Sequence, residues 1–196
     1  MGFADLLIKL KIGYDTKIGR EVGSTIMKYI QEIADETSLD LAKERGVFPA
    51  WDRSEYAQQD DSEYRNACRL TVAPTGTISM LADTSEDLME YVADGGSLQD
   101  RDDVPQWAKD VFVTSADIPG KSHVSMQAAF QEYCDSGISK TINFPNDATV
   151  QDIATVYLEA WRTDCKGITV YRAGSRDKEV LVSKTKEESN KESMDL

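Results

Sequence analysis

Short β-rich segments alternate with helical patterns along this 196-residue chain, and the alternation leaves few folds open to it. Three segments rich in β-branched residues have the composition of strands, at residues 68–72, 138–144 and 168–171. Single strands separated by helices form largely parallel sheets, because each helix returns the chain to the end of the sheet from which it came. The sequence therefore predicts an α/β fold with helices packed outside mostly parallel strands.

Apolar residues at helical spacing predict the helices of this fold. The predicted helices cover residues 3–11, 17–45, 104–113, 123–135 and 149–166. In the longest helix the expected buried stripe consists of Ile26, Tyr29, Ile30, Ile33, Ala34 and Leu41. In the last helix Thr149 and Asp152 approximate a capping box, and the expected apolar face consists of Val150, Ile153, Val156, Tyr157, Ala160 and Trp161. Residues 47–66 have the composition of an extended surface loop.

The charge balance excludes several kinds of partner. The chain carries 35 acidic and 22 basic residues, which gives a formal net charge of -13. Such acidity argues against a nucleic acid or an anionic membrane, so we expect no direct DNA or RNA binding and no membrane attachment. The sequence shows no signal-peptide pattern and no apolar stretch near ~18 residues, which predicts a cytoplasmic protein.

Three separated cysteines and one histidine restrict the chemistry further. Cys68, Cys134 and Cys165 form no Cys-x-x-Cys pair, so their spacing predicts neither a disulfide framework nor a metal site. We interpret them as small core residues. We expect His123 near the first turn of a helix, in a capping or partly buried role, because no nucleophile partner for it is identifiable nearby in the sequence.

The turn that follows the first predicted strand is the strongest candidate site. Small and hydroxyl residues there are expected to open a helix, whose unpaired N-terminal amides bind phosphate without a basic side chain. Gly76 lets the backbone approach a ligand closely, and the hydroxyls add donors. The predicted phosphate-binding residues are Ala73, Pro74, Thr75, Gly76, Thr77, Ile78 and Ser79. Pro-Thr-Gly-Thr is also common in ordinary turns, so the turn alone leaves both interpretations open.

Longer motifs favour the phosphate site. The chain contains MGFADLL at 1–7, ERGVFP at 44–49, APTGTIS at 73–79, MQAAFQ at 126–131, SKTIN at 139–143 and KGITVYR at 166–172. In this order they resemble the C-terminal third of class II ribonucleotide reductases, the adenosylcobalamin-dependent (vitamin B12-dependent) family. The resemblance implies that residues 1–182 form the C-terminal part of a ten-stranded α/β barrel and that residues 73–79 grip the phosphates of a ribonucleotide substrate. Residues 183–196 are predicted to be a disordered charged tail.

The chain also departs from that family. The resemblance implies that the radical cysteine loop and most of the adenosylcobalamin site precede the first motif, so we expect no catalytic residue in this chain. A segment also looks missing after Asp87. Our main hypothesis is therefore a partner of a larger reductase chain that carries the radical cysteine and makes deoxyribonucleotides. The alternative is a truncated non-catalytic relic, or a nucleotide-binding or regulatory module. The sequence leaves a diphosphate and a triphosphate substrate equally open.

Overall fold

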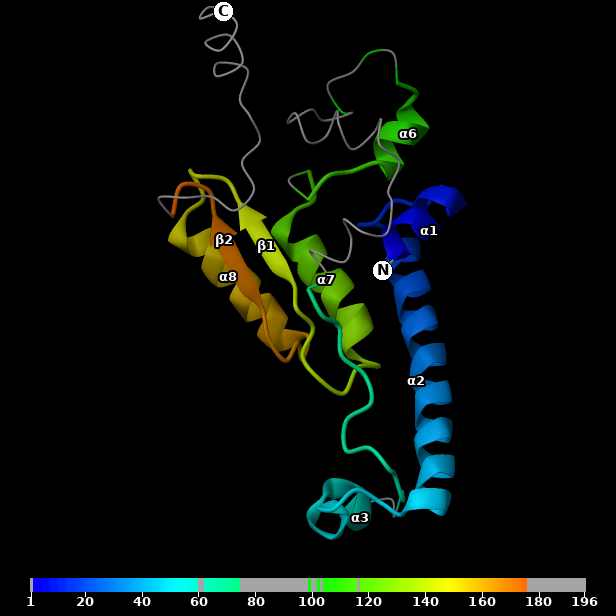
Figure 1. Cartoon of the computed structure of the whole chain (residues 1–196). Coiled ribbons are helices and arrows are strands. Elements are labelled where there is room, and N and C mark those ends of the chain that lie inside the picture. The colour runs from blue at the N-terminus through cyan, green and yellow to red at the C-terminus, as the bar shows by residue number, and fades with distance from the viewer. Residues whose placement is uncertain are drawn as a thin grey trace, which may run out of the picture.

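A computed structural model describes residues 2–59, 62–74, 99, 102, 104–115 and 117–175 (Figure 1). Its elements along the chain are α1 (Phe3–Leu10), α2 (Lys17–Arg45), the 3-10 helix η1 (Trp51–Arg53), α3 (Glu55–Gln59), α6 (Gln106–Val111), α7 (Gly120–Gln131), β1 (Thr141–Phe144), α8 (Val150–Arg162) and β2 (Thr169–Arg172). The alternation of helices with single strands is as the sequence predicts. The predicted tail lies outside the described residues.

The strands are parallel. β1 pairs with β2 in a register that runs from Thr141 opposite Thr169 to Phe144 opposite Arg172. On the other side of β1, Val72 forms a parallel bridge with Ile138. The Ser139 amide donates to the Val72 carbonyl at 2.9 Å. The predicted strand at 68–72 is thus present as a bridged segment rather than a full strand, and it lies beside the residues that lead into β1.

Helices cover one face of this sheet. Figure 1 shows α7 between α2 and α8, with the β1–β2 pair next to α8. One buried cluster joins α7, β1 and α8 through Val124, Ile142, Val156 and Ala160. A second cluster joins α2 to the end of α7 and the bridged segment through Met27, Cys134 and Ile138. The predicted α/β arrangement, with helices outside parallel strands, is confirmed.

The longest helix has the predicted bounds but not the predicted buried face. α2 begins after Thr16, whose hydroxyl accepts from the Gly19 amide at 3.0 Å. The predicted stripe is wrong at its centre, because Tyr29 is 65% exposed and Ile30 and Ile33 are also exposed. The residues that α2 buries are instead Gly19, Gly23, Met27, Ser38 and Ala42. Small side chains on that face let α2 approach α7 closely, and the larger apolar residues point away.

Two further predictions about local structure need correction. Residues 47–66 are not an extended loop, because they contain η1 and α3. Phe48 is buried there, and the Trp51 indole donates to the Ser62 carbonyl at 2.7 Å. The α8 capping box at Thr149 is confirmed, but part of its predicted apolar face is not buried, since Val150 is 86% and Trp161 77% exposed. In the described part of the chain, no helix is long and apolar enough to cross a membrane.

Candidate functional site

The sheet face that turns away from the helices is polar and open. Side chains alternate between the two faces of a strand, and Ile138, Ile142 and Phe144 pack toward the helices. The residues on the opposite face are exposed and carry hydroxyl or amide groups: Thr71, Ser139, Thr141, Asn143 and Thr169. Thr141 and Thr169 are direct partners in the register, so they lie side by side on this face. A polar ligand therefore has an accessible surface here.

The predicted phosphate turn begins at the edge of that face. Ala73 and Pro74 follow Val72 directly and are exposed, and Val72 accepts from Ser139 of the neighbouring strand. Val72 is bridged to Ile138, three residues before β1 begins at Thr141, so Ala73 and Pro74 leave the paired segment near the start of β1. The other five predicted residues, 75–79, lie outside the described residues. The phosphate site as a whole stays a prediction.

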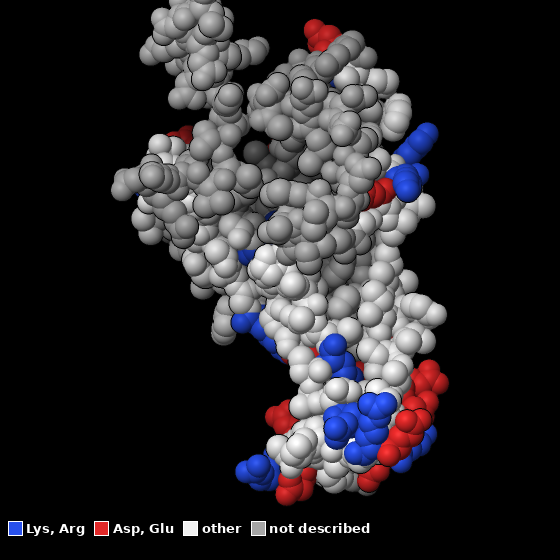
Figure 2. Space-filling view, in the orientation of Figure 1, with Lys and Arg blue, Asp and Glu red and all other residues white. Residues whose placement is uncertain are grey.

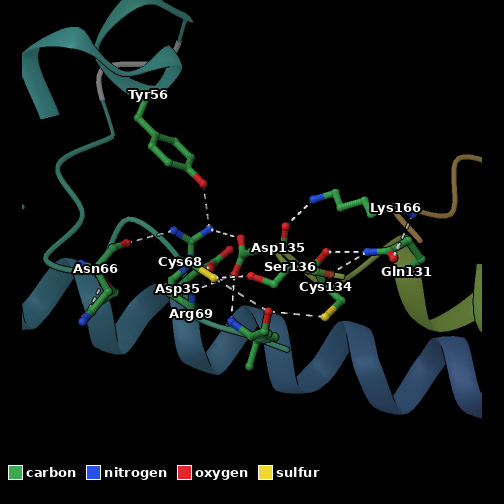
Figure 3. A network of polar contacts seen from close by, with 12 residues as sticks. Asp35, Tyr56, Asn66, Cys68, Arg69, Gln131, Cys134, Asp135, Ser136 and Lys166 are labelled. Carbon is green, nitrogen blue, oxygen red and sulfur yellow. Dashed lines mark hydrogen bonds and ion pairs between the residues drawn. The ribbon is translucent and has the colours of Figure 1, made fainter. Parts of the chain in front are cut away.

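A buried arginine anchors the strand that leads into the turn. The Arg69 side chain is 6% exposed, and its guanidinium pairs with Asp35 of α2 at 2.5 Å and with Asp135 at 3.0 Å. It also donates to the Tyr56 hydroxyl at 3.3 Å and lies over the Tyr64 ring at 4.1 Å. We call these five residues the Arg69 network; Figure 3 shows most of them. Residues far apart in the sequence thus meet at one cation.

The network compensates the burial of this cation. Burial opposes the charge of Arg69, but the Tyr56 hydroxyl and the two carboxylates outweigh that effect and raise the pKa of the guanidinium. Elsewhere the visible charges are on the surface: Figure 2 shows Lys, Arg, Asp and Glu side chains intermingled around the end that carries α3. Exposed pairs of that kind contribute little to stability, so the Arg69 network stands apart as a structural feature.

Helix α7 carries a buried row of three polar side chains at a spacing of four residues. His123 donates from Nε2 to the Ser115 carbonyl at 3.0 Å, and Gln127 donates to the Gly167 carbonyl at 2.5 Å. Gln131 donates to the Cys134 and Ser136 carbonyls, both at 2.9 Å. We call His123, Gln127 and Gln131 the α7 polar row. Because Gln127 and Gln131 bind the loops that enter β2 and β1, the row fixes α7 against both strands.

The histidine and the three cysteines differ in how deeply they are buried. His123 is only 2% exposed and burial lowers its pKa, so it is more buried than predicted and caps no helix. It borders a pocket of about 500 Å³ with Tyr14 and Lys140; burial raises the pKa of Tyr14 to about 12 and lowers that of Lys140. All three cysteines were predicted to be core residues: Cys134 is buried and Cys165 is half-buried, but the prediction is wrong for Cys68, which is exposed. Among the described residues no three His, Cys, Asp or Glu side chains form a metal-type group.

Sequence reasoning missed Arg69, Asp135 and the two glutamines of the α7 polar row. The available signals were weak. The acidic partners of Arg69 are distant in the sequence, since Asp35 and Asp135 are 34 and 66 residues away. Gln127 and Gln131 are four residues apart, which places them on one helix face, but nothing in the sequence says that this face is buried.

The comparisons with known proteins all match ribonucleotide reductases. The sequence model described as "Ribonucleotide reductase, barrel domain" matches residues 1–63 and 87–171. A vitamin B12-dependent ribonucleoside-diphosphate reductase of Thermoplasma acidophilum is 39% identical over 235 aligned positions, covering all of this chain and 30% of the relative. The protein of the same name from Mycobacterium tuberculosis strain CDC 1551 is 34% identical, covering 93% of this chain and 32% of the relative.

A solved structure shows the same fold. The class Id ribonucleotide reductase alpha subunit of Actinobacillus ureae matches 89% of this chain and 38% of that subunit, with a TM-score of 0.67 and 21% identity. The chain therefore spans about a third of the length of these three proteins. The alignment with the Thermoplasma relative is longer than this chain, as expected if an internal segment is missing. The family-model match leaves out residues 64–86, which include the predicted turn.

Proposed function

The chain belongs to the ribonucleotide reductase barrel-domain family, and we propose that it supplies the C-terminal part of the catalytic barrel of an adenosylcobalamin-dependent ribonucleotide reductase. The proposed reaction converts ribonucleotides to deoxyribonucleotides. The names of the two relatives favour a diphosphate substrate. The observation that carries the proposal is the parallel sheet, whose open polar face leads directly into the turn at Ala73 and Pro74.

The proposed role of this chain is to hold the substrate phosphates. Backbone amides and hydroxyls of residues 73–79 would bind the phosphate oxygens, with the substrate lying toward the polar face of the sheet. Because such a grip is local and uses backbone dipoles, the net charge of -13 does not oppose it. The polar side chains at Thr141 and Asn143 would then face the bound nucleotide rather than the helix layer.

Adenosylcobalamin would generate the radical that starts the reaction, but the described residues do not fit a corrin site. The only histidine of the sequence, His123, is buried and its Nε2 is engaged by the Ser115 carbonyl. We therefore assign most of the cofactor site to protein outside the described residues. The contribution of this chain is substrate binding and the closure of the barrel wall.

Exposed apolar helix faces support a larger reductase chain as the partner. On α2, Tyr29, Ile30 and Ile33 form one stripe. On α8, Val150, Tyr157, Leu158 and Trp161 form another. Contiguous apolar surface of this kind usually marks an interface, because burying it removes apolar area from water. We propose that the rest of the barrel, carried by a larger chain with the radical cysteine, covers these stripes.

Reconstitution tests the function. The purified chain, mixed with the larger chain, adenosylcobalamin, a dithiol and a ribonucleoside diphosphate, is expected to form deoxyribonucleotide well above the amount made by the larger chain alone. Trp161→Ala is expected to weaken the gain because it removes the most exposed aromatic side chain of the α8 stripe. The adjacent Arg162→Ala, on the same turn, serves as the matched control. No gain with the wild-type chain would favour the relic or the regulatory module.

A substitution in the turn tests the site. In the assembled protein, Gly76→Val is expected to weaken ribonucleoside diphosphate binding by about tenfold or more, because a branched side chain blocks the approach of the phosphate to the backbone. Equilibrium binding measures the effect. The control is Gly167→Val, since a Cβ at Gly167 meets nothing within 4 Å. Unchanged affinity in Gly76→Val would contradict the assignment of residues 73–79.

A further inference from the structure

One carboxylate binds the start of the segment that precedes the turn. Oδ2 of Asp135 accepts from the backbone amides of Arg69 at 2.8 Å and Leu70 at 2.9 Å. Oδ1 of the same side chain accepts from the Arg69 guanidinium at 3.0 Å. Asp135 therefore binds both the main chain and the side chain of Arg69, as Figure 3 shows.

Other bonds also attach the segment: the Thr71 hydroxyl donates to the Gly137 carbonyl at 3.2 Å, and the Cys134 thiol donates to the Leu70 carbonyl at 3.4 Å. The Ser136 amide donates to Leu70 at 3.0 Å and the Ser139 amide donates to Val72 at 2.9 Å. Asp135 precedes these two bonds and supplies the acceptor for the two amides at the start of the segment. A slip of one residue would turn Leu70 and Val72 out of the buried cluster with Met27 and Ile138. The Asp135 carboxylate thus fixes Arg69 as the residue at which the pairing of the segment begins.

Asp35 is bound to the same guanidinium but differs in one respect. Its carboxylate pairs with Arg69 Nε from α2, and among the described residues no bond from Asp35 to the backbone of the strand is recorded. The two carboxylates therefore share the ion-pairing role, while the contact with the strand amides belongs to Asp135. A change at Asp135 is therefore expected to affect both the position of the segment and the stability of the protein, whereas a change at Asp35 is expected to affect stability alone.

We propose that Asp135 is a positioning residue for phosphate binding. By holding the amides of Arg69 and Leu70, it fixes the register of the segment and therefore the position at which Ala73 and Pro74 leave it. The inference rests on the proposed function of residues 73–79. Asp135 acts through the strand and does not touch the substrate. Only three residues, 70–72, lie between Arg69 and Ala73, so a displacement at the start of the segment is passed on to Ala73 and Pro74.

The test compares Asp135→Asn with Asp35→Asn. Asparagine at 135 keeps the size of the side chain, but its NH2 group must face either the guanidinium or the two backbone donors, so one set of bonds is lost. In the assembled protein without cobalamin, Asp135→Asn is expected to raise the dissociation constant of a ribonucleoside diphosphate by about fivefold to tenfold, as a small misplacement of binding groups does. Asp35→Asn is expected to change it by less than about twofold.

Two further measurements identify the cause. Amide hydrogen exchange at Leu70 is expected to accelerate in Asp135→Asn and to stay at the wild-type rate in Asp35→Asn. In the active complex, Asp135→Asn is expected to raise KM for the nucleotide while kcat changes little. A merely structural role would instead weaken nucleotide binding in both variants in proportion to their loss of stability.

The outcomes separate this inference from the function on which it rests. Unchanged nucleotide affinity in Asp135→Asn, or equal losses in the two variants, overturns the positioning role. Unchanged affinity in Gly76→Val is a different result and overturns the phosphate site itself. A selective loss in Asp135→Asn, together with faster exchange at Leu70, supports the positioning role.

Discussion

Replacing Arg69 with methionine is expected to destabilise the protein by about 3–5 kcal/mol, because it leaves two acidic side chains without their buried cation. Methionine keeps much of the apolar stem of the side chain, so the loss reflects the guanidinium rather than a cavity. Asp135 is the more buried of the two partners, and its side chain is 13% exposed against 26% for Asp35. The free energy of unfolding, from denaturant titration of the protein, measures the effect.

Two further variants show whether the stability lost in Arg69→Met comes from the buried ion pairs. Arg53→Met, at an exposed position, is expected to change the free energy of unfolding by no more than about 0.5 kcal/mol. Adding Asp35→Asn to Arg69→Met is expected to recover part of the loss, because one unpaired carboxylate is removed. If Arg69→Met were no worse than Arg53→Met, the network would have no stabilising role.

Replacing Gly23 with leucine is expected to cost about 3 kcal/mol or more by forcing α2 away from α7. A Cβ at Gly23 would lie 2.5 Å from Cε2 of Phe130 and 3.3 Å from Cζ of Phe3. These two rings are themselves in edge contact, with centroids 5.0 Å apart, so neither can move without disturbing the other. The free energy of unfolding again measures the loss.

Smaller and matched substitutions test the cause of the Gly23 effect. Alanine in place of a helical glycine normally gains about 1 kcal/mol, yet Gly23→Ala is expected to destabilise because its single added carbon already meets Phe130. Gly167→Leu adds the same side chain where a Cβ meets nothing within 4 Å, and it is expected to be tolerated. A stabilising Gly23→Ala would contradict the close packing of α2 on α7.

Local sequence signals predicted the element types well. The helix at 17–45 has its predicted bounds, since a long apolar periodicity before Gly46 depends only on nearby residues. The capping box at Thr149 and Asp152 was equally predictable, because both partners lie within one turn. The predicted class of parallel α/β fold followed from the order of these elements.

The exposed stripes and the buried cation could not be predicted in this way. Apolar periodicity shows which residues favour burial, and it does not show whether the surface that buries them lies within the same 196 residues. Tyr29 and Trp161 are therefore periodic and yet exposed. Arg69 depends on tertiary contacts with α2, α3 and the end of α7, and no local pattern records them. The turn at 73–79 was proposed from composition and resemblance, and only Ala73 and Pro74 of it are described.

The α7 polar row also has a consequence for how the helix finds its place during folding. An apolar helix packs almost equally well after a small rotation about its axis, because dispersion and apolar burial have little directionality. In α7, a wrong rotation would leave the imidazole of His123 and the amides of Gln127 and Gln131 without their carbonyl partners, at about 1–3 kcal/mol for each group. The row therefore favours a single rotation of α7 about its axis. This rotation in turn aligns the loops that enter β1 and β2.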